Sequence, residues 1–243
     1  MQSILEFDVA RQRPAVNGLD VYILDDPASL SVDLAKAAVT VTHASAARVV
    51  VGGWYILRHQ VYALNTFTLQ KCSGAVFKDV TIYSAAGMGL YAQFSTDITL
   101  RSFNVAKRMT DAGPRPMSIT ADAVHCNACN GTVLIADSLF EGQGDDGLNV
   151  HGKFGVVESI TSSTTITMQK DDATEHCGML ATVGDTIEFR RRDSFQHVTT
   201  ATLKAVVGLN ATLDLVPMGI KRGDLIVSLS WMPTFVVSEE ACG

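Results

Sequence analysis

Apolar and polar residues alternate in short segments that recur along the first two thirds of the chain. Such alternation predicts β-strands rather than helices. One series of aligned segments starts at positions 23 and then 35 residues apart, and consists of Ala75–Ile82, Ile98–Val105 and Val133–Phe140. A second series follows the first, with starts 34 and 24 residues apart, and consists of Met88–Tyr91, Asp122–His125 and Asp146–Asn149.

Two short strands that return about every two dozen residues predict the coils of a parallel β-solenoid. The longer intervals fit a coil with an inserted loop, which we place at Met109–Met117 because this segment contains two prolines. Parallel strands linked by helices would need helical periodicity between them, and none is visible. The predicted fold class is therefore all-β.

The later part of the chain shows strong alternation after Gly-Asp turns, which predicts a small β-barrel at about 156–230. Val51–Arg58 begins with a Gly-Gly turn, continues with the same alternation and suggests a remnant of a second barrel at about 20–58. The strands expected in the later group are Ile160–Met168, Val183–Arg190, Val198–Val207, Ala211–Leu215 and Arg222–Ser228. We therefore expect four regions: 1–58 with a partial barrel module, 59–155 with the solenoid coils and the active site, 156–230 with the inserted barrel, and 231–243 as the start of a returning solenoid strand.

Composition adds limits on partners. The chain has 243 residues, of which 47% are apolar and 18% charged, with a formal net charge of −6. No apolar run reaches the 18 or more residues of a membrane span, so a membrane is not an expected partner. The acidic balance argues against nucleic acid. The oligomeric state stays open.

Acidic residues gather in two of the predicted strand segments. Thr120–His125 contains Asp122, and Gly144–Gly152, which starts 19 residues after His125, contains Asp145 and Asp146. Equivalent positions on successive coils lie about 4.8 Å apart, so Asp122 should lie beside Asp146. Three neighbouring carboxylates cannot all ionise cheaply, and a retained proton is what a general acid requires.

This cluster has one ordinary structural alternative and one geometric requirement. An Asp-Asp-Gly sequence often forms only a polar turn. Asp145 would face away from Asp146 on an ideal strand, so the site requires that Gly142, Gly144 and Gly147 bend the chain and turn Asp145 outward. In the predicted register His125 is level with Asn149.

The five cysteines predict no metal site and no disulfide framework. Cys126 and Cys129 form a Cys-x-x-Cys next to His125, but a structural zinc site needs four ligands and no second pair has a suitable spacing. Cys129 matches Cys72 in the solenoid register, which favours a small buried core residue. The odd count leaves the cellular compartment unassigned.

The segment from about 51 to 155 resembles the glycoside hydrolases of family 110, which are exo-acting α-1,3-galactosidases. The resemblance is carried by Leu57–Tyr62, Thr120–His125 and above all Phe140–Gly152. It implies a right-handed parallel β-helix carrying small inserted β-barrel modules. It also implies inverting hydrolysis of terminal α-linked galactose without a metal or other cofactor. Polygalacturonases share the β-helix and a similar aspartate triad.

An inverting mechanism can be assembled from three aspartates, one as the acid and the others activating water, with carboxyl separations of about 6.5–9.5 Å. We assign Asp122 and Asp146 to the water and Asp145 to the acid. The candidates for sugar binding are His125, Asn149, His151, Arg58 and His59.

Each of these sugar-binding candidates has an ordinary structural alternative. A histidine can be satisfied by the backbone of a neighbouring coil, and Arg58 with His59 can form a salt-bridged strand end. Tyr62 and Tyr91 could stack on a sugar face or simply pack at a coil end.

Three functions remain open at this stage. The first is an inverting α-galactosidase. The second is a polygalacturonase-like enzyme, which would need a cationic site, whereas the only basic candidates near the acidic segment are Lys153 and the loop residues Arg108 and Arg115. The third is a catalytically inactive β-helix fragment that only binds glycans.

The two chain ends bear on whether the sequence is truncated. The N-terminal segment lacks the features of a signal peptide, although the resemblance suggests an exported protein, so the localisation stays open. The C-terminal segment from Trp231 stops where a new strand is expected. We therefore expect a truncated chain that lacks further coils.

Overall fold

The computed structural model describes residues 3–21, 29–42, 48–170, 180–231 and 234–237. These residues form an all-β structure that contains no α-helix. The all-β prediction is thus confirmed. Within the same ranges, no helix is long and apolar enough to cross a membrane.

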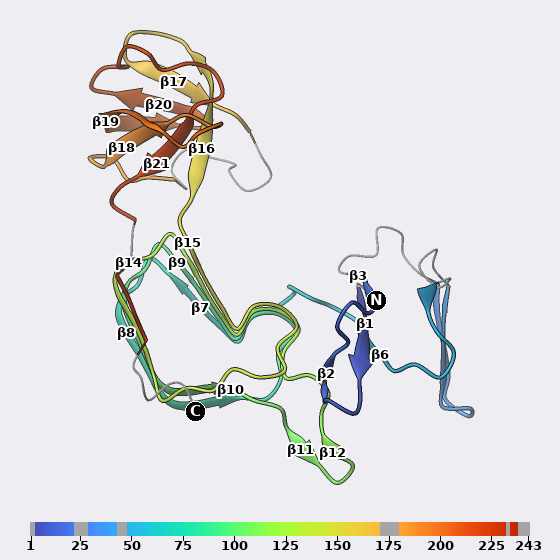
Figure 1. Ribbon diagram of the computed structural model, residues 1–243. Coiled ribbons are helices and arrows are strands. Elements are labelled where there is room, and N and C mark those ends of the chain that lie inside the picture. Colours follow the sequence, from blue (N-terminus) through green and yellow to red (C-terminus); the bar gives the residue numbers. More distant parts are fainter. Residues whose placement is uncertain (1–2, 22–28, 43–47, 171–179, 232–233, 238–243) are drawn as a thin grey trace.

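Two parallel four-stranded sheets form the central part of the protein (Figure 1). Apart from the separate β11–β12 pair, successive strands from β7 to β15 alternate between the two sheets, so the chain winds from one to the other in repeated coils. The first sheet contains β7 (Phe67–Gln70), β9 (Leu90–Gln93), β13 (Val124–Asn127) and β15 (Leu148–His151). The second contains β8 (Ser73–Ile82), β10 (Thr96–Val105), β14 (Asn130–Ala136) and β22 (Thr234–Val237).

The register of these sheets is the one that the repeat predicts. In the second sheet Ile98 pairs with both Ala75 and Val133, which are the starts of the aligned segments. In the first sheet Val124 pairs with Leu90 and Leu148. The spacing of apolar positions therefore correctly identified which residues lie side by side on successive coils.

Left-handed backbone conformations recur at equivalent positions of successive coils. Such positive φ angles are uncommon for residues other than glycine, so their repetition marks corners at which each coil bends in the same way. One corner follows the strands of the first sheet, at Lys71, Phe94 and Ala128, and another lies at Asp79, Ser102 and Asp137, with φ between 48° and 55° throughout.

The interior between the two parallel sheets is apolar and fully buried around Leu90, Ile98 and Val124. An aromatic group extends it, because the Phe77 ring lies 4.9 Å from the Phe67 ring and 5.8 Å from the Phe103 ring. These side chains stack coil upon coil, which fixes the sheets against each other.

The cysteines of the Cys-x-x-Cys pair belong to this core. Cys126 and Cys129 are both buried, so the interpretation of Cys129 as a core residue is confirmed. A hydrogen bond with Cys129 and burial raise the pKa of the Cys126 thiol. Among the described residues, no group of three or more His, Cys, Asp or Glu side chains could hold a metal ion.

A closed six-stranded barrel is inserted between β15 and β22. It has an apolar core of its own around Val157, Ile166 and Phe189. Its strands are β16 (Phe154–Ile160), β17 (Thr165–Met168), β18 (Thr186–Arg190), β19 (His197–Val207), β20 (Asn210–Leu213) and β21 (Leu225–Ser228).

One predicted strand of this region is divided. Ile160–Met168 was expected to form a single strand, but β16 ends at Ile160 and a tight turn precedes β17. In this turn the backbone N–H groups of Thr161 and Ser162 both donate to the Thr165 carbonyl. The segment therefore forms the tip of a hairpin.

The N-terminal region forms an open antiparallel sheet in which β1 (Ser3–Asp8) pairs with β2 (Arg13–Pro14), β3 (Asp20–Val21) and β6 (Tyr55–Arg58). A separate hairpin consists of β4 (Ser29–Asp33) and β5 (Ala38–Thr42). The described residues of this region do not close into a barrel.

The expected loop at Met109–Met117 contains a short hairpin of β11 (Met109–Thr110) and β12 (Gly113–Pro114). Figure 1 shows this hairpin projecting from the coils.

Candidate active site

Asp122 and Asp146 occupy equivalent positions on adjacent coils. Each lies two residues before a paired strand residue, because Val124 pairs with Leu148. The Ala123 N–H donates to the Asp146 carbonyl over 2.9 Å, which extends the pairing back to the two aspartates. The backbone adjacency predicted for them is confirmed.

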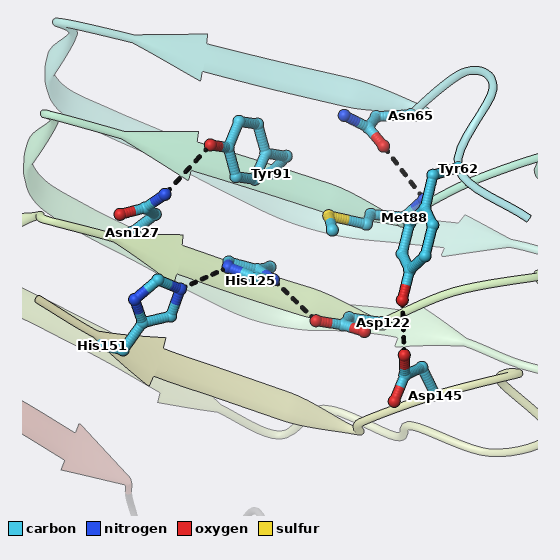
Figure 2. A network of polar contacts seen from close by, with 9 residues as sticks. All are labelled: Tyr62, Asn65, Met88, Tyr91, Asp122, His125, Asn127, Asp145 and His151. Carbon is cyan, nitrogen blue, oxygen red and sulfur yellow. Dashed lines mark hydrogen bonds and ion pairs between the residues drawn. The ribbon is translucent and has the colours of Figure 1, made fainter. Parts of the chain in front are cut away.

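Asp122 is buried, with 3% of its surface exposed, and its carboxylate contacts His125, which in turn contacts His151. Its Oδ2 lies 2.7 Å from His125 Nδ1, and His125 Nε2 lies 2.8 Å from His151 Nε2. His151 Nδ1 in turn lies 2.8 Å from the Gly152 carbonyl oxygen. Figure 2 shows this row of side chains running along β13 and across to β15, from a buried carboxylate to an exposed imidazole.

Asp145 and Asp146 are both exposed, but their surroundings differ. The Tyr62 hydroxyl donates to Asp145 Oδ2 over 2.6 Å (Figure 2). The Asp146 carboxylate receives no hydrogen bond from the part of the chain that the structure describes. Asp146 is thus open to water and ligands, whereas Asp145 is held by a phenol.

Two glycines explain how the chain bends next to these aspartates. Gly142 has a φ of 69°, a conformation that favours glycine. Gly144 has no space for a side chain, because a Cβ atom there would collide with the Thr120 carbonyl and reach the Arg58 guanidinium. The glycine-rich sequence therefore permits close contact between the two acidic segments.

Arg58 joins these segments from the inside. It is 2% exposed, and its Nη1 donates to the carbonyl oxygens of Gly144, at 2.9 Å, and Thr120, at 3.3 Å. Its Nε donates to Ser3 Oγ over 2.7 Å, and Asp20 lies 3.7 Å from Nη2. These contacts agree with the alternative interpretation of Arg58 as a paired residue at a strand end, and they give it a positioning role.

His59 is exposed and lines a cavity of about 320 Å³. Arg58, Arg115, Ser118 and Thr120 also contribute to the wall of this cavity. Because Thr120 precedes Asp122 by two residues, the cavity adjoins one of the acidic segments.

The remaining candidates lie on the outer face of the first sheet. Asn149 pairs with His125 as predicted and is partly exposed. The Tyr91 ring packs edge-on against the His125 ring at 5.4 Å, and its hydroxyl accepts a hydrogen bond from Asn127 Nδ2. These contacts favour the packing interpretation of Tyr91.

The sequence did not predict the contact between Tyr62 and Asp145, because it suggested only a sugar platform or a packing residue at a coil end for Tyr62. The two residues are 83 positions apart. Tyr62 lies before the first repeated strand, so the repeat carries no signal that could have paired them.

By sequence, the chain is related to glycoside hydrolases. The relationship is to α-1,3-galactosidases, the enzymes of family 110. It is 29% identical over 169 residues, or 70% of this chain, to α-1,3-galactosidase A of Shewanella woodyi. It is 40% identical over 90 residues, or 37% of this chain, to α-1,3-galactosidase B of Parabacteroides distasonis, and 34% identical over 122 residues, or 49% of this chain, to α-1,3-galactosidase B of Bacteroides fragilis.

The aligned part of the chain spans only a fraction of these relatives. It covers 27% of the Shewanella woodyi protein, 14% of the Parabacteroides distasonis protein and 20% of the Bacteroides fragilis protein. A comparison with models of protein families found no match.

Proposed function

We propose that the chain carries the catalytic centre of an exo-acting glycosidase that removes terminal α-1,3-linked galactose with inversion of configuration. The observation that carries this proposal is the placement of Asp122 and Asp146 at equivalent positions on adjacent coils. The relationship to α-1,3-galactosidases supports the choice of substrate. A carbohydrate is accordingly the expected partner.

We further infer that the two parallel sheets belong to a right-handed parallel β-helix. The alternation of strands between the sheets and the repeated corners support this inference. Region 59–155 then holds the coils with the active site, 156–230 is an inserted barrel module and 1–58 is an N-terminal module. In region 231–243, β22 returns to the stack beside β14, while residues 232–233 and 238–243 lie outside the described part of the chain.

In the proposed mechanism Asp145 is the general acid. Tyr62 donates a hydrogen bond to Oδ2 of Asp145. A protonated carboxyl group is also a donor, and Asp145 in this form gives its proton to the glycosidic oxygen. Asp122 and Asp146 hold and deprotonate the attacking water on the opposite side of the sugar ring. His125, Asn149, His151 and His59 are the candidates for contact with sugar hydroxyls, while Arg58 positions the two acidic segments.

Three separate substitutions test the assignment: Asp122→Asn, Asp145→Asn and Asp146→Asn. Each should lower kcat/KM on p-nitrophenyl α-galactoside by about 10²-fold or more, because acid–base groups contribute roughly 10²–10⁴-fold. Asp79→Asn is the matched control, since Asp79 lies at an exposed coil corner of the same stack and should keep full activity. Activity near that of the parent in any of the three variants removes that aspartate from the mechanism.

Two other functions give different results in the same assays. A polygalacturonase-like enzyme would act on polygalacturonate, but Arg58 is already bound to backbone carbonyls and Lys153 lies 5.5 Å from the centre of the Phe94 ring. A glycan-binding module would bind galactose without turnover. The relationship to galactosidases supports the proposed activity over both alternatives.

A further inference from the structure

Asp122, His125, His151 and the Gly152 carbonyl form an unbroken row of short polar contacts, of 2.7, 2.8 and 2.8 Å. These lengths are those of hydrogen bonds, so each contact contains one proton. Two lone pairs facing each other at such distances would repel. The row of contacts therefore fixes the number of protons that the three side chains share.

The count starts from the Gly152 carbonyl, which can only accept. His151 Nδ1 must therefore carry a proton. The contact between the two Nε2 atoms needs a second proton, and the contact between His125 and Asp122 needs a third. An ionised aspartate with two neutral histidines would hold only two.

The surroundings favour this additional proton. The Asp122 side chain is 4% exposed and that of His125 is 14% exposed, and a buried carboxylate is costly unless its charge is compensated. Asp146, on the adjacent coil, adds a like charge. The Tyr91 ring that packs against His125 and the strand partner Asn149 are neutral, and the nearby Cys129 thiol supplies no positive charge either.

We propose that Asp122, His125 and His151 form a proton-holding unit that retains this third proton, with His125 as an imidazolium and Asp122 ionised. An imidazole is the stronger base of the two groups, so the shared proton resides on Nδ1. His125 and His151 are thus positioning residues for Asp122 rather than only sugar contacts. The inference rests on the proposed function for its catalytic meaning, but not for the proton count.

The unit decides which oxygen of Asp122 can react. Oδ2 always faces the proton on His125, whereas Oδ1 accepts no hydrogen bond from the described residues. Oδ1 is therefore the oxygen that takes a proton from water, as the water oxygen bonds to the anomeric carbon and the departing glycosidic oxygen takes the proton of Asp145. The imidazolium also offsets the charge of Asp122 next to Asp146, so both can be ionised at once.

Nuclear magnetic resonance of the chain with ¹⁵N-labelled histidine rings tests the count without any need for activity. At neutral pH, three of the four ring nitrogens of His125 and His151 should be protonated, with His151 Nε2 as the acceptor. Asp122→Asn removes the anion that holds the third proton, so the count should fall to two. Asp145→Asn is the matched control, because Asp145 bonds to Tyr62 and not to a histidine in the row, and the count should stay at three.

The inference is overturned if only two ring nitrogens are protonated in the parent chain. It is also overturned if the number of protonated ring nitrogens falls equally in Asp122→Asn and Asp145→Asn. Kinetics supply a second measurement where the chain hydrolyses a galactoside. His151→Ala should lower kcat about tenfold with little change in KM, less than the loss expected for removing the base itself. His151→Gln should restore part of kcat, because its amide oxygen can accept from His125 Nε2.

The two proposals fail separately. A count of three in a chain that lacks activity on every galactoside leaves the proton-holding unit intact and removes the proposed function. Hydrolysis of a galactoside together with a count of two protonated ring nitrogens supports the proposed function and removes the proton-holding unit. Equal kcat values for the parent and His151→Ala also contradict the inference.

Discussion

At the scale of single residues, Arg58 has a structural role, because its hydrogen bonds join the two acidic segments. Arg58 reaches the carbonyls of Thr120 and Gly144 with one nitrogen and Ser3 with another. A guanidinium can do this because its donors are spread over a rigid plane, whereas an ammonium is a point charge. The positions of Asp122 and Asp145 therefore depend on an arginine that is itself buried.

Arg58→Lys should accordingly lower the free energy of unfolding by about 2–4 kcal/mol, since hydrogen bonds from charged groups contribute roughly 1.5–3 kcal/mol each and more than one is lost. Urea unfolding at neutral pH measures the change. Arg101→Lys, on an exposed position of β10, is the control and should change stability by less than about 0.5 kcal/mol. Equal stability of the two variants would show that the bridge contributes nothing.

The sequence allows part of this residue-scale arrangement to be predicted. The adjacency of Asp122 and Asp146, and of His125 and Asn149, follows from a fixed repeat, because side-by-side positions in a parallel stack are one coil apart in sequence. Arg58 was a candidate for sugar binding, with a salt-bridged strand end as the alternative, and its burial depends on the pairing of β6 with β1 in the N-terminal sheet. That sheet lies outside the repeat, so spacing carries no information about it.

At the scale of elements, the strands were predictable wherever apolar alternation continued through a whole coil. The turn between β16 and β17 was not, because Thr161–Thr165 is rich in β-branched residues, which also favour strands. Backbone hydrogen bonds to the Thr165 carbonyl, rather than composition, decide that this segment turns.

The Asp214 carboxylate, in the barrel, leads to a prediction about the pH dependence of stability. Asp214 Oδ1 accepts hydrogen bonds from the backbone N–H groups of Thr202 and Leu215, and these bonds lower the pKa of Asp214. A depressed folded-state pKa contributes stability that is present above the unfolded value, about 3.9, and is lost as pH falls through the folded pKa. The barrel should therefore lose stability below about pH 4 partly through Asp214.

Asp214→Asn keeps an oxygen that can accept both bonds but cannot ionise. The variant should show a smaller loss of stability between pH 5 and pH 3 than the parent, by urea unfolding at both values. Asp193→Asn, at an exposed site in the turn before β19, is the control and should follow the parent curve. Identical pH dependence in the parent and Asp214→Asn would contradict the role of Asp214.

At the scale of the whole molecule, two apolar cores are distinct. One lies between the parallel sheets around Phe103, and the other lies inside the barrel around Phe189. The barrel interrupts the stack between β15 and β22, yet its first and last strands are partners, with Phe154 opposite Val227. The chain therefore enters and leaves the barrel at neighbouring points, which is the geometry of an independent insertion.

The barrel should thus fold without the coils. A fragment of residues 153–229 is expected to give β-sheet circular dichroism and a cooperative urea transition, because strand closure leaves no open edge and the core around Phe189 is internal to it. Phe189→Ala should remove about 3–5 kcal/mol, and should shift the same transition in the fragment and in the full chain.

A fragment that stays unfolded, while the full chain unfolds in one transition, would mean that the coils supply part of the stability of the barrel. In that case Phe189→Ala would also weaken the stack, and near-ultraviolet signals from Tyr91, on the outer face of β9, would change together with those of the barrel. Independent folding predicts the opposite: Tyr91 keeps its packing against His125 when the barrel core is damaged, so activity at the aspartates should survive a substitution that unfolds the barrel.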